Sequence, residues 1–109
     1  MADLSTGWKV YFTDEAVNEF LALSAGFQGK MFALLEFLEE VGPFQIPPKR
    51  KKFLRSGIWE LRVDALEGTA RALYVMGARK IFVVLLFVKK TEHTPAHIMD
   101  LAEKRIKEV

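Results

Sequence analysis

Residues 81–88 form an uninterrupted run of eight apolar side chains, and this run limits the folds open to the chain. Eight residues fall far short of the ~20 that a membrane-spanning helix needs. A run of this length and composition is typical of a central strand that is covered on both faces. We therefore expect a partly enclosed sheet with this strand in its interior.

Two further strands are predicted before that run. In residues 58–63, Trp59, Leu61 and Val63 fall on one face, while Glu60 and Arg62 fall on the other. We expect the first face to be buried and the second to be open. Residues 70–76 are rich in strand-forming side chains and follow a Glu-Gly pair that suits a turn. With a short strand at residues 9–12, these segments predict a mainly antiparallel sheet.

The N-terminal part predicts two helices that form an antiparallel hairpin. Thr13 is the expected N-cap of the first, which has acidic residues in its first turn and should end near Gly26. The second is expected after Gly29, and its apolar spacing continues to about Val41. A short connection between two such helices requires an antiparallel pair, whose apolar stripes can cover one face of the sheet.

A third helix is expected at the C-terminus. Thr94 is the predicted N-cap, with Pro95 at the first helical position. The residues that share its apolar stripe are Ile98, Leu101, Ala102, Arg105 and Val109. The predicted fold is therefore α+β, with element order β-α-α-β-β-β-α and with 109 residues in a single domain.

Charge is distributed unevenly along a chain whose formal net charge is only +2. Residues 1–48 contain two basic and seven acidic side chains, whereas residues 49–109 contain fourteen basic and seven acidic ones. A concentrated positive surface favours a polyanionic partner.

The chain has no cysteine and begins without an apolar leader, so we expect a cytoplasmic protein with no disulfide and no membrane association.

A basic run after two prolines is the strongest compositional signal for that partner. Its members are Lys49, Arg50, Lys51, Lys52 and Arg55. In a loop, such cations can follow a phosphate backbone, and Lys52 and Arg55 lie nearest the sheet. The alternative is a solvated loop that only aids solubility.

More cations accompany the strands and the end of the apolar run. Arg62 and Arg71 lie in neighbouring strands, where they can hold a phosphate or form an ion pair with Glu60. Lys89, Lys90 and His93 follow the last strand, and His93 is the group among them that titrates near neutral pH. Arg71 is expected to project from an open face of the sheet. His93 and His97 lack the partners of a zinc site, and we expect neither a metal nor a cofactor.

The chain contains the motifs GIWELR, ARALYVM and FVKKTEHTP in this order. With this order and spacing, it resembles the RelE/ParE toxin superfamily and, within it, the HigB-like, phage-derived branch. The resemblance covers nearly the whole chain. It implies a toxin of a type II toxin–antitoxin system, silenced by an antitoxin with a helix-turn-helix, HigA-like fold. It also implies metal-independent cleavage of mRNA, often on the ribosome.

The resemblance also implies a set of catalytic residues. It assigns Arg71, Lys89 and Lys90 to the site, with Arg62 beside them. In such a reaction the RNA 2′-hydroxyl is the nucleophile, and the protein supplies positive charge and proton transfer. His93 is our candidate acid, and Lys89 or Lys90 is the alternative.

Two other functions are compatible with the same residues. The first is inhibition of a protein target such as gyrase, as in the ParE branch. The second is RNA binding without catalysis. Residues 94–109 contain no Phe, Tyr or Trp, whereas several ribosome-dependent members of the superfamily stack a C-terminal aromatic residue on a base, which leaves base selection open.

Overall fold

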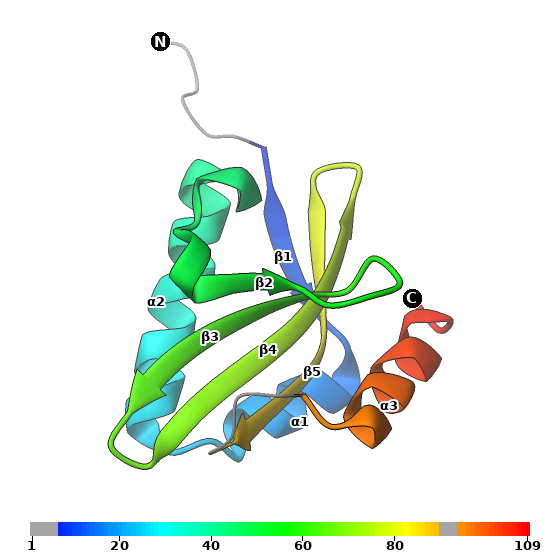
Figure 1. Cartoon of the computed structure of the whole chain (residues 1–109). Coiled ribbons are helices and arrows are strands. Elements are labelled where there is room, and N and C mark those ends of the chain that lie inside the picture. Colours follow the sequence, from blue (N-terminus) through cyan, green and yellow to red (C-terminus); the bar gives the residue numbers. More distant parts are fainter. Residues whose placement is uncertain (1–6, 90–93) are drawn as a thin grey trace, which may run out of the picture.

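A computed structural model describes residues 7–89 and 94–109, which form a five-stranded sheet with helices on both faces (Figure 1). In chain order the elements are β1 (Lys9–Phe12), α1 (Asp14–Leu21), α2 (Ala25–Val41), the 3-10 turns η1 (Pro43–Gln45) and η2 (Pro48–Arg50), β2 (Lys51–Phe53), β3 (Trp59–Ala65), β4 (Gly68–Gly77), β5 (Lys80–Lys89) and α3 (Ala96–Ile106). The strand order is β1-β5-β4-β3-β2, with β1 parallel to β5 and the other pairs antiparallel. This arrangement confirms the α+β prediction and the interior position of the apolar strand.

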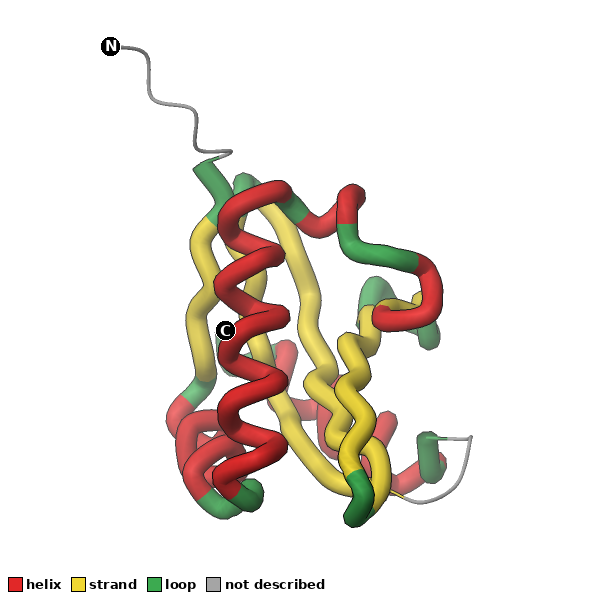
Figure 2. Tube along the Cα trace, turned by 90° about the vertical axis from the view of Figure 1, so that its left-hand side faces the viewer, coloured by secondary structure: helices red, strands yellow, loops and turns green. Residues whose placement is uncertain are grey.

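The two faces of the sheet carry different layers. Figure 2 shows α2 running along one face, where Phe27, Met31 and Leu38 pack against buried strand residues that include Leu61. On the other face, Met99 and Ala102 of α3 pack against Leu73 and Leu85. The helix α3 is short, so it covers only part of that face. The same face carries the candidate site.

Strand β2 was not predicted from the sequence. Residues 51–53 lie within the basic segment that we expected to be a loop, yet they pair with residues 59–61 and make β2 an edge strand. Pairing with β3 supplies hydrogen bonds that outweigh the weak strand propensity of consecutive lysines. The prediction of four strands was therefore wrong by one.

The predicted boundary between the first two helices was also wrong. Helix α1 ends at Leu21 and α2 begins at Ala25, so Gly26 and Gly29 lie inside α2. Ser24 determines this boundary because its hydroxyl accepts a hydrogen bond from the backbone nitrogen of Phe27, at 3.3 Å. The first backbone N–H groups of a helix have no partner within the helix, and a serine at the N-cap accepts a hydrogen bond from one of them. This contact favours a helix start at Ala25. Thr13 caps α1 as predicted, by accepting a hydrogen bond from the nitrogen of Ala16.

The start of α3 differs from the prediction as well. Its N-cap is Pro95, which makes no side-chain capping bond, and the hydroxyl of Thr94 instead donates to Glu60. The expected apolar stripe is partly wrong, since Leu101 is exposed and Val109 lies beyond the helix. Met99 and Ala102 are the residues that α3 buries.

A β-bulge in β5 shapes the face beneath α3. Leu73 is paired with Leu85, whereas its neighbour Tyr74 is paired with Val83, so Val84 is the extra residue. Val84 and Leu85 both belong to the cluster under α3 as a result. Arg105 donates to the Val84 carbonyl at 2.9 Å, and the Leu86 nitrogen donates to Glu19 at 3.0 Å. Arg105 and Glu19 also pair with each other, at 2.9 Å, so α1, α3 and β5 meet at the bulge.

Candidate functional site

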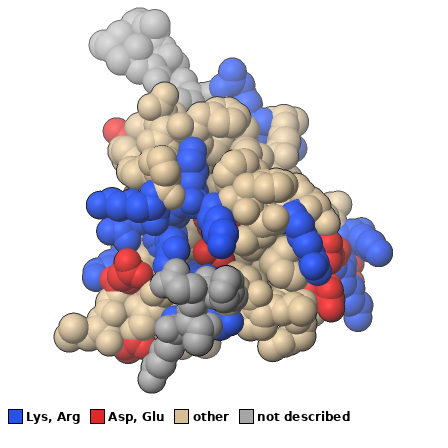
Figure 3. Space-filling view, viewed as in Figure 1, with Lys and Arg blue, Asp and Glu red and all other residues tan. Residues whose placement is uncertain are grey.

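The face of the sheet that carries α3 also carries a cation on each of four neighbouring strands. Lys52 of β2 is paired with Glu60 of β3, Arg62 is paired with Arg71 of β4, and Lys89 of β5 is paired with Thr69. Because alternate residues of a strand share a face, these side chains project to the same side of the sheet. Figure 3 shows Lys and Arg side chains gathered over β2, β3 and the turns before them.

Two of these cations oppose each other directly. Arg62 and Arg71 occupy the same register position in β3 and β4, and like charges directly opposite in a sheet are destabilising. Glu60 lies on the same face and pairs with Arg71, which compensates one of the two charges. In residues 7–89 and 94–109 Arg62 is at ion-pair distance from no acidic side chain, although its charge contributes to the lowered pKa of Asp64, so it is the cation of this pair that can meet an anion.

Arg71 is not on an open face, so that prediction was wrong. Its side chain is only 2% exposed, Glu60 is fully buried, and the Nη1 atom of Arg71 lies 3.4 Å from Oε2 of Glu60. The ion-pair alternative is therefore the contact observed. Residues Leu73 and Phe87 flank Arg71 on neighbouring positions and belong to the cluster under α3.

Thr94 adds a third member to this buried group. Its hydroxyl donates a hydrogen bond to Oε2 of Glu60 at 2.8 Å, which links the segment before α3 to the interior of β3. Sequence reasoning did not assign Glu60 or Thr94 to the site. The available signal was one-sided, namely the largely apolar sequence of β4, which predicts cover on both faces of that strand.

Some cations of the basic run form ion pairs or hydrogen bonds, and the others are exposed. Arg50 lies 3.3 Å from Asp64, and Lys51 donates to the Pro43 carbonyl at 3.1 Å. Arg55 pairs with Asp100 and Glu103 of α3, at 3.0 Å each. Lys49 and Lys52 are exposed, and within residues 7–89 and 94–109 neither lies at ion-pair distance from an acidic side chain.

Four residues considered in the sequence lie at the end of the last strand or after it. Lys89 is the final residue of β5 and is partly buried. Lys90 and His93 lie outside the described residues, so their predicted roles stay predictions. His97 is exposed in the first turn of α3.

The loop between β2 and β3 is fastened to α3 by polar contacts. The hydroxyl of Ser56 donates to Glu103, which Arg55 also contacts. The hydrogen bond from Ser56, together with the Arg55 charge, lowers the pKa of the Glu103 carboxyl below its ordinary value of 4.5. Asp64 is affected in a similar way, because the hydroxyl of Thr69 and the charge of Arg50 lower the pKa of its carboxyl.

The lowered pKa of Glu103 predicts a pH-dependent contribution to stability. A depressed carboxyl pKa stabilises the folded state above the unfolded value, and this stabilisation is lost as the pH falls through the folded value. We expect Glu103→Gln to unfold at a lower denaturant concentration than the wild type at pH 7. The difference should shrink as the pH falls below 4.5. A difference that stays constant across this range would show that the amide loses packing rather than charge.

The described residues offer no preformed metal centre. In residues 7–89 and 94–109, no three side chains of His, Asp or Glu converge as metal ligands would. In the same residues, none of the helices combines the length and the apolar character that crossing a bilayer requires.

Comparison with known proteins gives one family and one fold. A sequence profile of the family described as "Phage derived protein Gp49-like" matches residues 18–107. A search of curated proteins finds no significant match.

Three solved structures of toxins share the fold. One is the RelBE2 toxin–antitoxin complex from Mycobacterium tuberculosis, with 19% identity, a TM-score of 0.57, and coverage of 75% of this chain and 98% of that one. The isolated RelE toxin of E. coli has 16% identity and a TM-score of 0.56, with coverage of 91% and 98%. The YoeB–YefM complex of Staphylococcus aureus has 16% identity and a TM-score of 0.54, with coverage of 79% and 98%.

Proposed function

Because this chain belongs to the Gp49-like family of phage-derived proteins and has the fold of the RelE toxins, we propose that it is a type II toxin that cleaves mRNA. The observation that carries the proposal is the set of cations on the sheet face that also carries α3, namely Lys52, Arg62, Lys89 and the buried Arg71. A toxin that inhibits gyrase by binding it does not require a cluster of cations that can hold a phosphate group. The proposed partners are mRNA, the ribosome and an antitoxin.

The proposed reaction is a transesterification within the RNA. The 2′-oxygen attacks the adjacent phosphorus, the bond from phosphorus to the 5′-oxygen breaks, and a 2′,3′-cyclic phosphate remains. One proton leaves the 2′-hydroxyl and one is delivered to the departing 5′-oxygen. No oxidant or metal is required, because the RNA supplies its own nucleophile.

The described residues supply charge stabilisation in this mechanism. Arg62 and Lys89 are only partly buried, so they are the proposed direct contacts to the phosphate oxygens. Arg71 is buried beside them, and Glu60 offsets part of its charge, so its proposed role is a supporting electrostatic one rather than a direct contact. His93, and alternatively Lys90, is proposed from the sequence as the group that protonates the 5′-oxygen.

Primer extension on mRNA after induced expression tests this function. We expect new 5′ ends within coding sequences, and we expect purified protein with ribosomes and added mRNA to give the same ends. Growth arrest without new ends would contradict RNA cleavage and favour inhibition of a protein target. Co-expression of the neighbouring gene product should prevent the cleavage if that product is the antitoxin.

The basic run is proposed to give affinity for RNA that is independent of sequence. The exposed pair Lys49 and Lys52 should contribute most, because Arg50 and Arg55 are already compensated by carboxylates. We expect Lys49→Gln with Lys52→Gln to reduce the slope of log affinity against log salt by about 1.4, at ~0.7 for each contact with single-stranded RNA. Fluorescence anisotropy over a range of salt concentrations measures this slope.

The matched control is Arg50→Gln with Arg55→Gln, which removes the same charge from the same run. A smaller change in slope is expected for this pair. Equal changes would mean that only net charge matters, and an unchanged slope in both variants would identify the run as a solvated segment.

A further inference from the structure

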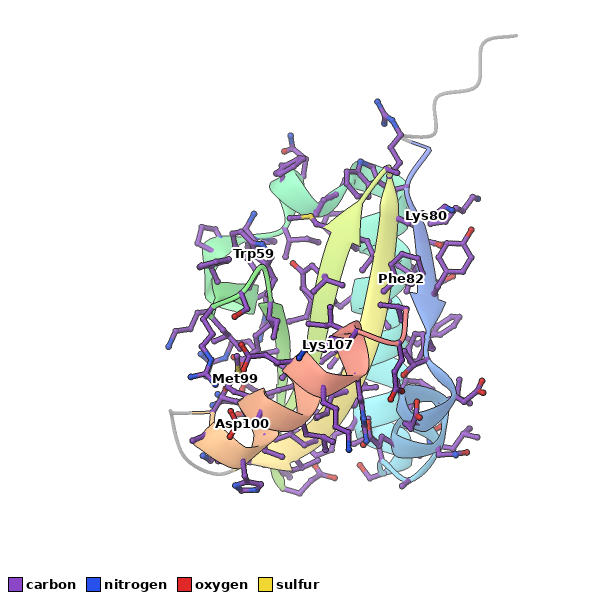
Figure 4. All side chains as sticks on the ribbon, turned by 90° about the vertical axis from the view of Figure 1, so that its right-hand side faces the viewer. Trp59, Lys80, Phe82, Met99, Asp100 and Lys107 are labelled. Atoms are coloured by element: carbon purple, nitrogen blue, oxygen red, sulfur yellow. The ribbon has the colours of Figure 1, made fainter. Side chains whose placement is uncertain are left out.

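A cavity of about 240 Å³ lies between β2 and the start of α3, beside the buried group that contains Glu60. It is lined by Lys52, Phe53, Leu54, Arg55, Thr94 and Met99. In Figure 4, Met99 lies on the side of α3 that faces the β2–β3 half of the sheet. The cavity is smaller than the ~300–1,000 Å³ of sites for drug-sized ligands, so it suits a group of the size of one nucleobase.

The lining combines an apolar surface with cations at its edge. Leu54 and Met99 both belong to the apolar cluster under α3. Lys52 and Arg55 carry the positive charge, and the half-exposed guanidinium of Arg55 is fixed by its two carboxylate partners. Cations for the adjoining phosphates next to a surface for a ring face are features of a single-stranded nucleotide site, with Leu54 and Met99 here in place of the aromatic side chains that commonly stack on a base.

The direction of the hydrogen bond that the Thr94 hydroxyl makes is fixed in this cavity. Its hydroxyl proton is committed to Glu60, because a carboxylate offers only acceptor oxygens, and the bond is 2.8 Å long. Glu60 is in turn held by Arg71. The lone pairs of Thr94 Oγ1 therefore remain available, so that this atom can accept a hydrogen bond from a ligand but cannot donate one.

We propose that this cavity binds one nucleobase of the RNA substrate and that Thr94 selects a base with an exocyclic amino group. Cytosine has an amine at the position where uracil has a carbonyl, and adenine has one where hypoxanthine has a carbonyl. An acceptor that Glu60 has fixed favours the amine and repels the carbonyl. The proposal rests on the RNA-cleaving function and names a base preference for it.

The test uses short oligonucleotides with 2′-O-methyl riboses, which block the nucleophile and remove the ribose hydroxyl as a donor. We expect the wild-type protein to bind oligocytidine about three- to tenfold more tightly than oligouridine, the ratio that one hydrogen bond supplies. Thr94→Val should abolish the preference, and Thr94→Ser should keep it. The same ratio should appear between oligoadenosine and oligoinosine.

Glu60→Gln provides a second, independent variant. With Arg71 bonded to the amide oxygen, the amide nitrogen would donate to Thr94 and release its hydroxyl to act as a donor. The preference for cytosine should then fall or reverse, whereas a role of Glu60 in packing alone would leave the ratio unchanged.

The remaining outcomes separate this proposal from the proposed function. Equal affinity of the wild type for cytosine and uracil, together with mRNA cleavage, overturns the base pocket and leaves the function intact. A Thr94-dependent gain that appears only with unmodified ribose overturns the base assignment in favour of the 2′-hydroxyl. No binding of any oligonucleotide, together with no cleavage of mRNA, overturns both proposals.

Discussion

Arg71→Ala is expected to remove both stability and toxicity. The substitution leaves Glu60 buried without its ion-pair partner, and breaking a buried pair in this way costs about 3–5 kcal/mol. That is a large part of the ~5–15 kcal/mol that stabilises a typical domain. Urea denaturation measures the loss, and growth after induction reports toxicity.

A matched double variant separates the two effects. Replacing both partners by methionine removes the charges together and keeps similar volume, which is often neutral or stabilising for a buried pair. We expect Glu60→Met with Arg71→Met to regain most of the lost stability and to remain slower in RNA cleavage by about 10²–10³. Normal cleavage by this folded double variant would show that Arg71 is structural only.

Arg62→Gln is expected to reduce cleavage strongly without weakening the fold. The arginine lies directly opposite Arg71, so its removal relieves a repulsion of about 0.2–1 kcal/mol. As a proposed contact to the phosphate, it should contribute about 10²–10³ to the rate. A single-turnover cleavage assay and a denaturation curve on the same preparation measure the two quantities.

The control is Lys80→Gln, which changes the net charge by the same amount at the opposite end of β5 from Lys89 (Figure 4). This variant should cleave RNA at the wild-type rate. If Arg62→Gln lost stability and kept its cleavage rate, Arg62 would belong to the fold rather than to the site.

The sequence was sufficient to predict the interior strand and the α+β class because apolar runs and alternation depend on burial, which local composition reveals. It was insufficient where a partner from elsewhere decided the outcome. Residues 51–53 become a strand because β3 pairs with them, and Ser24 rather than a glycine sets the helix boundary. The sequence contains no local sign of either partner.

The candidate site shows the same division. The cations of β3, β4 and β5 were chosen from the sequence by strand position and by the family resemblance, whereas the register that pairs Arg62 with Arg71 comes from the structure. The burial of Arg71 was missed because alternation assigns its face to solvent unless a helix from another part of the chain covers it. Thr94 was assigned to a helix cap for the same reason, since Glu60 lies thirty-four residues away and competes for its hydroxyl.

The bulge in β5 has a consequence for how the protein opens. Arg105 and Glu19 engage peptide groups one residue apart, so release of α3 would leave the Val84 carbonyl without this donor and Glu19 without its ion-pair partner. Detachment of α3 should therefore loosen β5 and α1 with it. In native-state hydrogen exchange, the Leu86 amide should exchange in the same cooperative unit as the amides of α3.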